Sequence, residues 1–237
     1  MNNIDTWLIG FMSPVAIHSP RFDHVLETMV SMYLFKGVAL TALLWWIWFR
    51  SERAEGPDGA ALRRRECEIV VIAIASGFIA LAAGRLLAHY LPFRLRPMYE
   101  PALRAFFPEA KVDEPVLRTW SAFPSDHVML WSAVAMGIFL ASRPVGIYAL
   151  FHAIVLIGLP RIFLGLHYPT DVLAGAVLGI GIACLMNVNA IRTRIAAPML
   201  AFAQRYPGVF YGGAFLLTFE LTTQFDELRV LAHGLLH

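Results

Sequence analysis

The chain has 237 residues, of which 58% are hydrophobic and 15% are charged. Soluble domains carry about 25% charged residues, so the composition excludes an ordinary soluble domain and indicates one membrane-embedded domain over residues 1–237. The formal net charge of +2 gives no basis for a nucleic-acid partner. The two cysteines, Cys67 and Cys184, are not expected to form a disulfide.

The N-terminal segment Ile4–Ile17 is apolar, but it is short and Pro14 interrupts it. We expect it to lie as a helix in the membrane interface rather than to cross the bilayer. The segment lacks the charged start and the small-residue cleavage site of a signal peptide. Membrane insertion is therefore expected to come from the later spans.

Six later stretches are apolar enough to form membrane-spanning helices, which need about 20 residues each. They lie at residues 28–49, 66–91, 127–142, 145–163, 170–189 and 208–224. None alternates as the strands of a barrel do. We therefore expect an all-α fold, a polytopic membrane helical bundle of about six transmembrane helices. In the fifth stretch, Gly175 and Gly179 form a small-xxx-small step that predicts close helix packing.

Basic residues are concentrated in the 50–65 loop, at Arg143 and in the 190–207 loop. An excess of Lys and Arg in short loops marks the cytoplasmic side of a membrane protein. The N-terminus, the long 92–126 loop, the 164–169 turn and the C-terminus then lie on the outer side. The sequence predicts a multi-pass protein of the plasma membrane in this orientation.

Ionisable residues near the outer ends of the spans are the strongest functional signal. Such residues are costly at membrane depth and usually serve a function. Two spans end on this side and two begin there, so a helical bundle would bring these residues together at one end. They are Arg85, His89, Arg94, Arg96, His127, Arg161, His167 and Asp171.

These residue types suit phosphoryl transfer. Arginine offers a permanently charged planar fork for phosphate oxygens, and Ser125 is a good N-cap at a helix start that can bind an anion. If Pro169 starts the fifth helix, Asp171 can reach back to the His167 ring and leave its other nitrogen free to attack phosphorus. His127 is then the acid for the leaving oxygen and the base for water.

The order of these residues resembles the type 2 phosphatidic acid phosphatase (PAP2) superfamily, and most closely its undecaprenyl diphosphate phosphatase branch. The family pattern has three blocks, Lys-x6-Arg-Pro, Pro-Ser-Gly-His and Ser-Arg-x5-His-x3-Asp. In this chain they read His89-x6-Arg96-Pro97, Pro124-Ser125-Asp126-His127 and Pro160-Arg161-x5-His167-x3-Asp171. The resemblance covers about residues 66–190 and leaves 208–224 as an additional C-terminal span.

The resemblance implies a hydrolase that needs no metal or cofactor and acts on a lipid phosphate or diphosphate in the membrane. One such reaction recycles a lipid carrier in cell wall biogenesis. His167 would be the nucleophile, Asp171 would orient it and His127 would be the acid. Phosphate would be bound by Arg96, Ser125 and Arg161.

Three positions depart from the family pattern. His89 stands in place of the lysine. We expect His89 and Arg85 to bind phosphate, with Arg85 or Arg94 as the candidates to supply the charge that a neutral imidazole lacks. Asp126 stands in place of the glycine, a form that looks like the undecaprenyl diphosphate phosphatase branch. Pro160 stands in place of the serine, which removes a hydroxyl next to Arg161.

Several readings stay open from the sequence. The substrate is a polyprenyl diphosphate, which the Pro-Ser-Asp-His form and the N-terminal layout favour, or a phosphatidate or phosphatidylglycerophosphate. A lipid-phosphate transporter or flippase predicts charges spread through the bilayer centre, whereas these cluster at one face. Vanadate-dependent haloperoxidases share the anion pocket but are soluble. Arg104, Lys111 and Arg118 are expected to form a solvated face, with a second phosphate as the alternative. The oligomeric state is not predicted.

Overall fold

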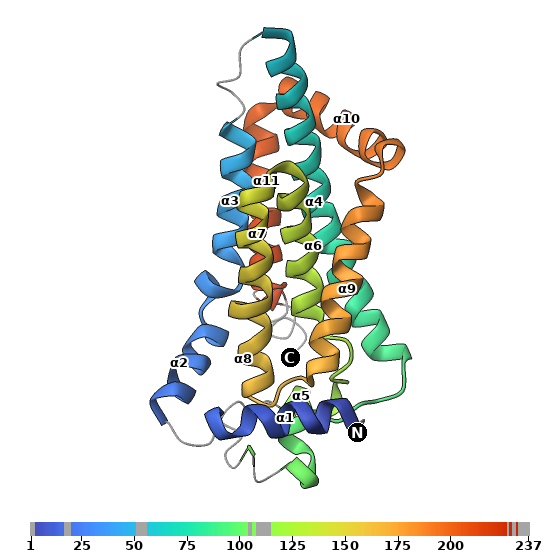
Figure 1. Cartoon of the computed structure of the whole chain (residues 1–237). Helices are drawn as coiled ribbons and strands as arrows, with labels where there is room; N and C mark the ends of the chain where they lie inside the picture. Colours follow the sequence, from blue (N-terminus) through green and yellow to red (C-terminus); the bar gives the residue numbers. More distant parts are fainter. Residues whose placement is uncertain are drawn as a thin grey trace.

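The computed structural model describes residues 3–16, 20–50, 56–103, 106–107, 115–226, 228 and 231. Every regular element in these ranges is a helix, and Figure 1 shows the long ones packed side by side, which confirms the all-α membrane bundle. Arg104 and Lys111 lie outside the described residues. The elements are α1 (Asn3–Ala16), α2 (Pro20–Ser31), η1 (Leu34–Val38), α3 (Ala39–Arg50), α4 (Gly56–Tyr90), η3 (Pro97–Tyr99), η4 (Pro101–Leu103), α5 (Pro115–Thr119), α6 (Asp126–Ala141), α7 (Arg143–Phe151), η5 (His152–Gly158), α8 (Leu159–Phe163), α9 (Pro169–Met186), α10 (Asn189–Arg205) and α11 (Pro207–Thr223).

Each of the six predicted spans lies on helical segments, although the first is a bent pair and α4 begins at Gly56, inside the predicted 50–65 loop. Three runs are long and apolar enough to cross a membrane, namely most of α4, the continuous α7–η5–α8 run and α9, and the bent pair α2–α3 adds a fourth. Helices α6 and α11 have 16 and 17 residues and are therefore shorter than a typical span. The chain is an integral membrane protein.

The first span is bent, whereas the sequence predicted one continuous helix over residues 28–49. Its two halves meet at an angle of 66°, next to the π-helical turn η1. Gly37 in this turn lies against Trp131 of α6, and a Cβ atom at position 37 would come within 2.0 Å of the indole. The missing side chain of Gly37 thus lets the backbone pack directly on the central helix.

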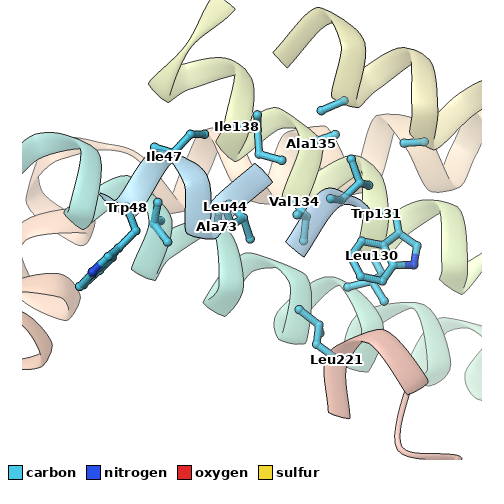
Figure 2. Packing of buried hydrophobic residues seen from close by; sticks show 14 of the residues in the cluster. Leu44, Ile47, Trp48, Ala73, Leu130, Trp131, Val134, Ala135, Ile138 and Leu221 are labelled. Atoms are coloured by element: carbon cyan, nitrogen blue, oxygen red, sulfur yellow. The ribbon is translucent and has the colours of Figure 1, made fainter. Parts of the chain in front are cut away.

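Helix α6 is the centre of the bundle and packs against α4, α7 and α9. Figure 2 shows Leu130, Trp131 and Val134 of α6 among side chains from α3, α4 and α11, including Leu44 and Leu221. These five side chains are almost completely buried. A helix that is apolar all round is stable only when other helices cover every face, which explains the central place of α6.

Helix α9 approaches α6 at the predicted small-xxx-small step. A Cβ atom on Gly175 would lie 2.6 Å from the carbonyl oxygen of Ser125, and one on Gly179 would lie 2.1 Å from that of Met129. Only glycine fits at this separation, so the prediction of close packing is confirmed. The contact at Gly175 fixes the start of α6 against the first turns of α9.

Helix α1 lies across one end of the bundle, beneath α8 and α9 (Figure 1). Ile4, Trp7 and Phe11 are exposed, whereas Ile9 is buried against Leu103 and Tyr168. The helix runs through Pro14 to Ala16. Its position and its exposed apolar face agree with the predicted interfacial helix.

The basic loops lie at the opposite end of the bundle, around the start of α4 and along α10 (Figure 1). Two buried glutamates there pair with arginines. Arg50 forms an ion pair with Glu66, and Arg192 Nε lies 3.3 Å from Glu68 Oε2. The charge bias that predicts the cytoplasmic side is thus partly neutralised where the loops meet the bundle.

Candidate active site

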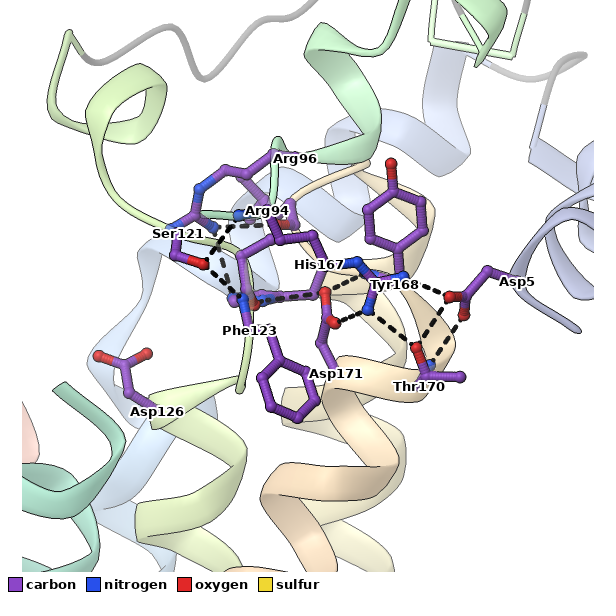
Figure 3. A network of polar contacts seen from close by, with 12 residues as sticks. Asp5, Arg94, Arg96, Ser121, Phe123, Asp126, His167, Tyr168, Thr170 and Asp171 are labelled. Carbon is purple, nitrogen blue, oxygen red and sulfur yellow. Dashed lines mark hydrogen bonds and ion pairs between the residues drawn. The ribbon is translucent and has the colours of Figure 1, made fainter. Parts of the chain in front are cut away.

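The predicted catalytic residues gather at the end of the bundle that α1 covers. The site is built from the segment that follows α4, the turn before α6, the 164–168 turn and the first turns of α6 and α9 (Figure 3). Three main-chain hydrogen bonds between these segments hold them together. Ala122 N donates to the carbonyl of Arg94 at 2.8 Å, and Met98 N donates to that of Gly165 at 3.0 Å. Ser125 N donates to that of Asp171 at 3.2 Å.

His167 lies in the tight turn between α8 and α9 and is 3% exposed. Gly165 makes the turn possible because its φ of 67° is in the left-handed region. The ring Nδ1 of His167 is 2.7 Å from the carbonyl oxygen of Ala122. A carbonyl can only accept, so Nδ1 carries the proton and Nε2 keeps its lone pair.

Two arginines lie close to the His167 ring. Arg96 Nη1 is 3.4 Å from His167 Nε2 and donates to the carbonyl of Leu166 at 2.9 Å. Burial, followed by the positive charges of Arg96 and Arg161, holds the pKa of His167 well below its ordinary value of 6.5. The ring is therefore neutral at physiological pH, as a nitrogen nucleophile must be.

Ser125 and Arg161 supply polar atoms that the described residues leave unsatisfied. Ser125 Oγ and Arg161 Nε are buried and have no hydrogen-bond partner within the described part of the chain. Ser125 occupies the N-cap position of α6 as predicted, but its hydroxyl makes no capping bond there. Buried donors without partners are costly, and an anion such as phosphate would satisfy them.

Asp171 lies in the first turn of α9, as predicted, but its link to His167 is indirect. Its Oδ2 atom is 4.0 Å from His167 Nδ1, which is too long for a hydrogen bond, and accepts instead from Tyr168 N at 2.8 Å. Its Oδ1 atom forms an ion pair with Arg94. The carbonyl of Ala122 occupies the position at Nδ1 that the sequence assigned to Asp171.

His127 lies in the first turn of α6 and has a carboxylate partner that the sequence did not assign. Asp126 Oδ1 is 2.9 Å from His127 Nδ1 and also accepts from His127 N at 2.8 Å. The carboxylate fixes the ring with Nδ1 protonated and Nε2 available for proton transfer. The replacement of the family glycine by Asp126 therefore adds an orienting group.

The side chains of the three candidates for the first-block cation have different contacts in the structure. His89 is exposed and its ring contacts Tyr90, so the structure does not support a phosphate-binding role for it. Arg85 Nη2 donates to the carbonyl of Gln224 at 3.0 Å, and its Nε lies 4.0 Å from Asp126 Oδ2. Arg94 is bound to carboxylates. The spacing located these residues along the chain but could not show where each side chain points.

The network around Arg94 contains residues that the motif spacing did not indicate. Arg94 forms a second ion pair with Asp5 of α1, and Thr170 bonds to both residues. The only hint of this in the sequence is that Asp5 is an acidic residue in an otherwise apolar segment. Arg118, by contrast, is exposed and stacks on the ring of Tyr99, in keeping with a solvated face.

A family model and known proteins are similar to this chain. The family model described as the PAP2 superfamily matches residues 65–194. The bacitracin transport permease protein BcrC of Bacillus licheniformis is 30% identical over 133 residues, which is 56% of this chain and 56% of that protein. The chain thus matches little more than half the length of that relative.

A solved structure is also similar. It is that of a transmembrane PAP2 type phosphatidylglycerolphosphate phosphatase from Bacillus subtilis, which is 22% identical with a TM-score of 0.47. The match covers 78% of this chain and 85% of that one. The family model spans more than half of the chain, and on that ground the chain belongs to the PAP2 superfamily.

Proposed function

We propose that this protein is a lipid phosphatase that hydrolyses a polyprenyl diphosphate, with undecaprenyl diphosphate as the first candidate, to the monophosphate. The observation that carries the proposal is the buried neutral ring of His167 beside Arg96, in a site where Ser125 Oγ and Arg161 Nε have no partner among the described residues. Membership of the PAP2 superfamily supports phosphate hydrolysis.

The first step forms a phosphohistidine. The Nε2 lone pair of His167 attacks the terminal phosphorus, the P–N bond forms, and the bond to the bridging oxygen breaks. Arg96, Arg161 and the Ser125 hydroxyl stabilise the charge on the transferring phosphoryl group. His127 enters this step as the imidazolium, protonated at both ring nitrogens, and donates its Nε2 proton to the leaving oxygen as the lipid monophosphate departs.

The second step releases the phosphate. His127, now neutral, removes a proton from water, and the water oxygen attacks phosphorus as the P–N bond breaks. Asp126 stabilises the imidazolium that His127 becomes in each cycle, because its carboxylate lies 2.9 Å from Nδ1. Both steps use side chains of this chain alone.

The Asp126-containing second block supports a diphosphate as the substrate class. Because the site lies at the end opposite the basic loops, we place it on the outer face of the plasma membrane. A thiol-reactive, membrane-impermeant reagent should label Arg118→Cys from outside the cell in a background without Cys67 and Cys184.

A comparison of substrates tests the proposal. Purified protein in detergent should release phosphate from undecaprenyl diphosphate faster than from phosphatidate or phosphatidylglycerophosphate, and with equal rates in the presence and absence of EDTA. A higher kcat/KM on phosphatidylglycerophosphate would overturn the substrate class. Loss of activity in EDTA would overturn the metal-free mechanism.

A further inference from the structure

Helix α1 contains a buried acidic residue at a place where the proposed mechanism does not use one. Asp5 is 0% exposed, whereas its neighbours Ile4 and Trp7 are exposed. An isolated buried carboxylate costs several kcal/mol unless it is paired and hydrogen-bonded. The partners of Asp5 therefore show what the helix is held against.

Those partners belong to the catalytic end of the bundle. Asp5 Oδ1 accepts from Thr170 N at 3.0 Å, and Oδ2 accepts from Thr170 Oγ1 at 2.8 Å. Oδ2 also forms an ion pair with Arg94 Nη2 (Figure 3). Thr170 is the residue directly before Asp171 in the first turn of α9.

Arg94 connects Asp5 to both sides of the nucleophile. Its other terminal nitrogen, Nη1, pairs with Asp171 and donates to Thr170 Oγ1 at 3.0 Å. Its main-chain carbonyl accepts from Ala122 N at 2.8 Å, and the Ala122 carbonyl in turn lies 2.7 Å from His167 Nδ1. A shift of Arg94 would move Ala122 on one side of His167 and Asp171 on the other.

The packing around Arg94 leaves its orientation dependent on Asp5. The guanidinium carbon lies 4.0 Å from the centroid of the Tyr168 ring, and that ring packs with Ile9 of α1. The planar fork of arginine suits two carboxylates, one at each terminal nitrogen. Without the charge of Asp5, one side of the fork loses its counter-ion.

We infer that Asp5 is a positioning residue, through which docked α1 orients Arg94 and thereby sets the place of the His167 ring. The inference rests on the proposed function of His167. It makes the N-terminal interfacial helix a part of the active site rather than a membrane anchor only. Asp5 does not touch the reacting atoms.

Asp5→Asn is the test variant because it keeps the size of the side chain and removes its charge. We expect kcat on undecaprenyl diphosphate to fall about 10- to 100-fold, the effect of a small displacement of a catalytic group. KM should stay within about twofold, since the phosphate-binding residues are unchanged. The rate of phosphohistidine formation, measured by rapid acid-free quench, should fall with kcat.

Asp58→Asn is the matched control, because Asp58 is an exposed carboxylate in the first turn of α4, and that helix starts at the end of the bundle opposite the site. It should retain the kcat of the unmodified protein. If neither the unmodified protein nor this control releases phosphate, the proposed function has failed. If both are active and Asp5→Asn has an unchanged kcat, the positioning role alone is wrong.

Arg94→Lys keeps the charge but cannot bridge two carboxylates, so it tests the same link from the other side. It also provides the test if Asp5→Asn lowers the melting temperature and the amount of folded protein. We expect a similar loss of kcat, and a double variant that is no worse than the worse single one. Additive losses, or an Arg94→Lys variant with full activity, would overturn the inference.

Discussion

His167 and His127 are held at the same end of the bundle in different ways. His167 is 3% exposed, hydrogen-bonded through Nδ1 to a main-chain carbonyl and close to two arginines. The His127 side chain is 24% exposed and bonded through Nδ1 to the carboxylate of Asp126. Burial and the charge of Arg161 act on both rings, but only the His127 ring is hydrogen-bonded to a carboxylate, which favours its imidazolium form. The difference suits one histidine to attack phosphorus and the other to carry a proton.

Among variants that keep the His167 nucleophile, the largest expected effect comes from His127→Ala. General acid-base catalysis contributes about 10²- to 10⁴-fold, so phosphate release should slow by that factor. With a diphosphate substrate the leaving group is a phosphate, whose second pKa is about 6, and it needs little help to leave. Water attack should then limit the rate, and phosphohistidine should accumulate in single-turnover experiments. If the variant loses turnover and phosphohistidine does not accumulate, the result would favour a substrate with an alcohol leaving group, such as phosphatidate.

Arg96→Gln tests why His167 is neutral. Loss of one charge-stabilising donor should lower kcat by about 10²-fold. The guanidinium disfavours protonation of the nearby ring, so its removal raises the pKa of His167. The acid limb of the kcat/KM profile should therefore move to higher pH. Arg118→Gln, a change at an exposed arginine, is the control and should leave the profile unchanged. If the acid limb does not move in Arg96→Gln, Arg96 does not influence the protonation of His167.

Asp126→Asn tests the other half of the comparison. The change removes a charge-assisted hydrogen bond of about 1.5 kcal/mol, which corresponds to a loss of roughly tenfold in kcat. Asp126→Gly, which restores the family residue, should show a similar loss. If both variants keep full activity, His127 does not depend on its carboxylate neighbour.

The smallest expected effect is that of His89→Ala. His89 is exposed and contacts Tyr90, so its loss should change kcat/KM by no more than about twofold. Phosphate release from undecaprenyl diphosphate measures it directly. A loss of more than tenfold would show that the last turn of α4 reaches the phosphate after all.

The sequence located most of this site because span ends converge in a helical bundle. Arg96, Ser125, His127 and Arg161 are placed by the ends of helices that hydropathy already indicates. The partner of His167 could not be predicted in the same way, since it depends on which loop carbonyl the fold brings to Nδ1. The motif gave the position of His89 along the chain but not the direction in which its side chain points.

Long-range contacts account for the other differences. Asp5 lies 89 positions before Arg94 in the chain, and no local spacing connects them. The bend in the first span lies beside the turn in which Gly37 packs against Trp131 of another helix, whereas hydropathy alone predicts a continuous helix there. Both features involve contacts between segments far apart in the chain, which a local pattern does not contain.

The central claim is that His167 forms a covalent bond to phosphorus, and trapping of that intermediate tests it most directly. The protein is mixed with undecaprenyl diphosphate labelled on its terminal phosphate, quenched in alkaline detergent and digested for mapping by mass spectrometry. We predict an acid-labile label on His167, present also in the exposed-histidine control His24→Ala and absent from His167→Ala, which should release no phosphate. A His167→Ala variant that still turns over, or a label that maps to His127, would contradict the account.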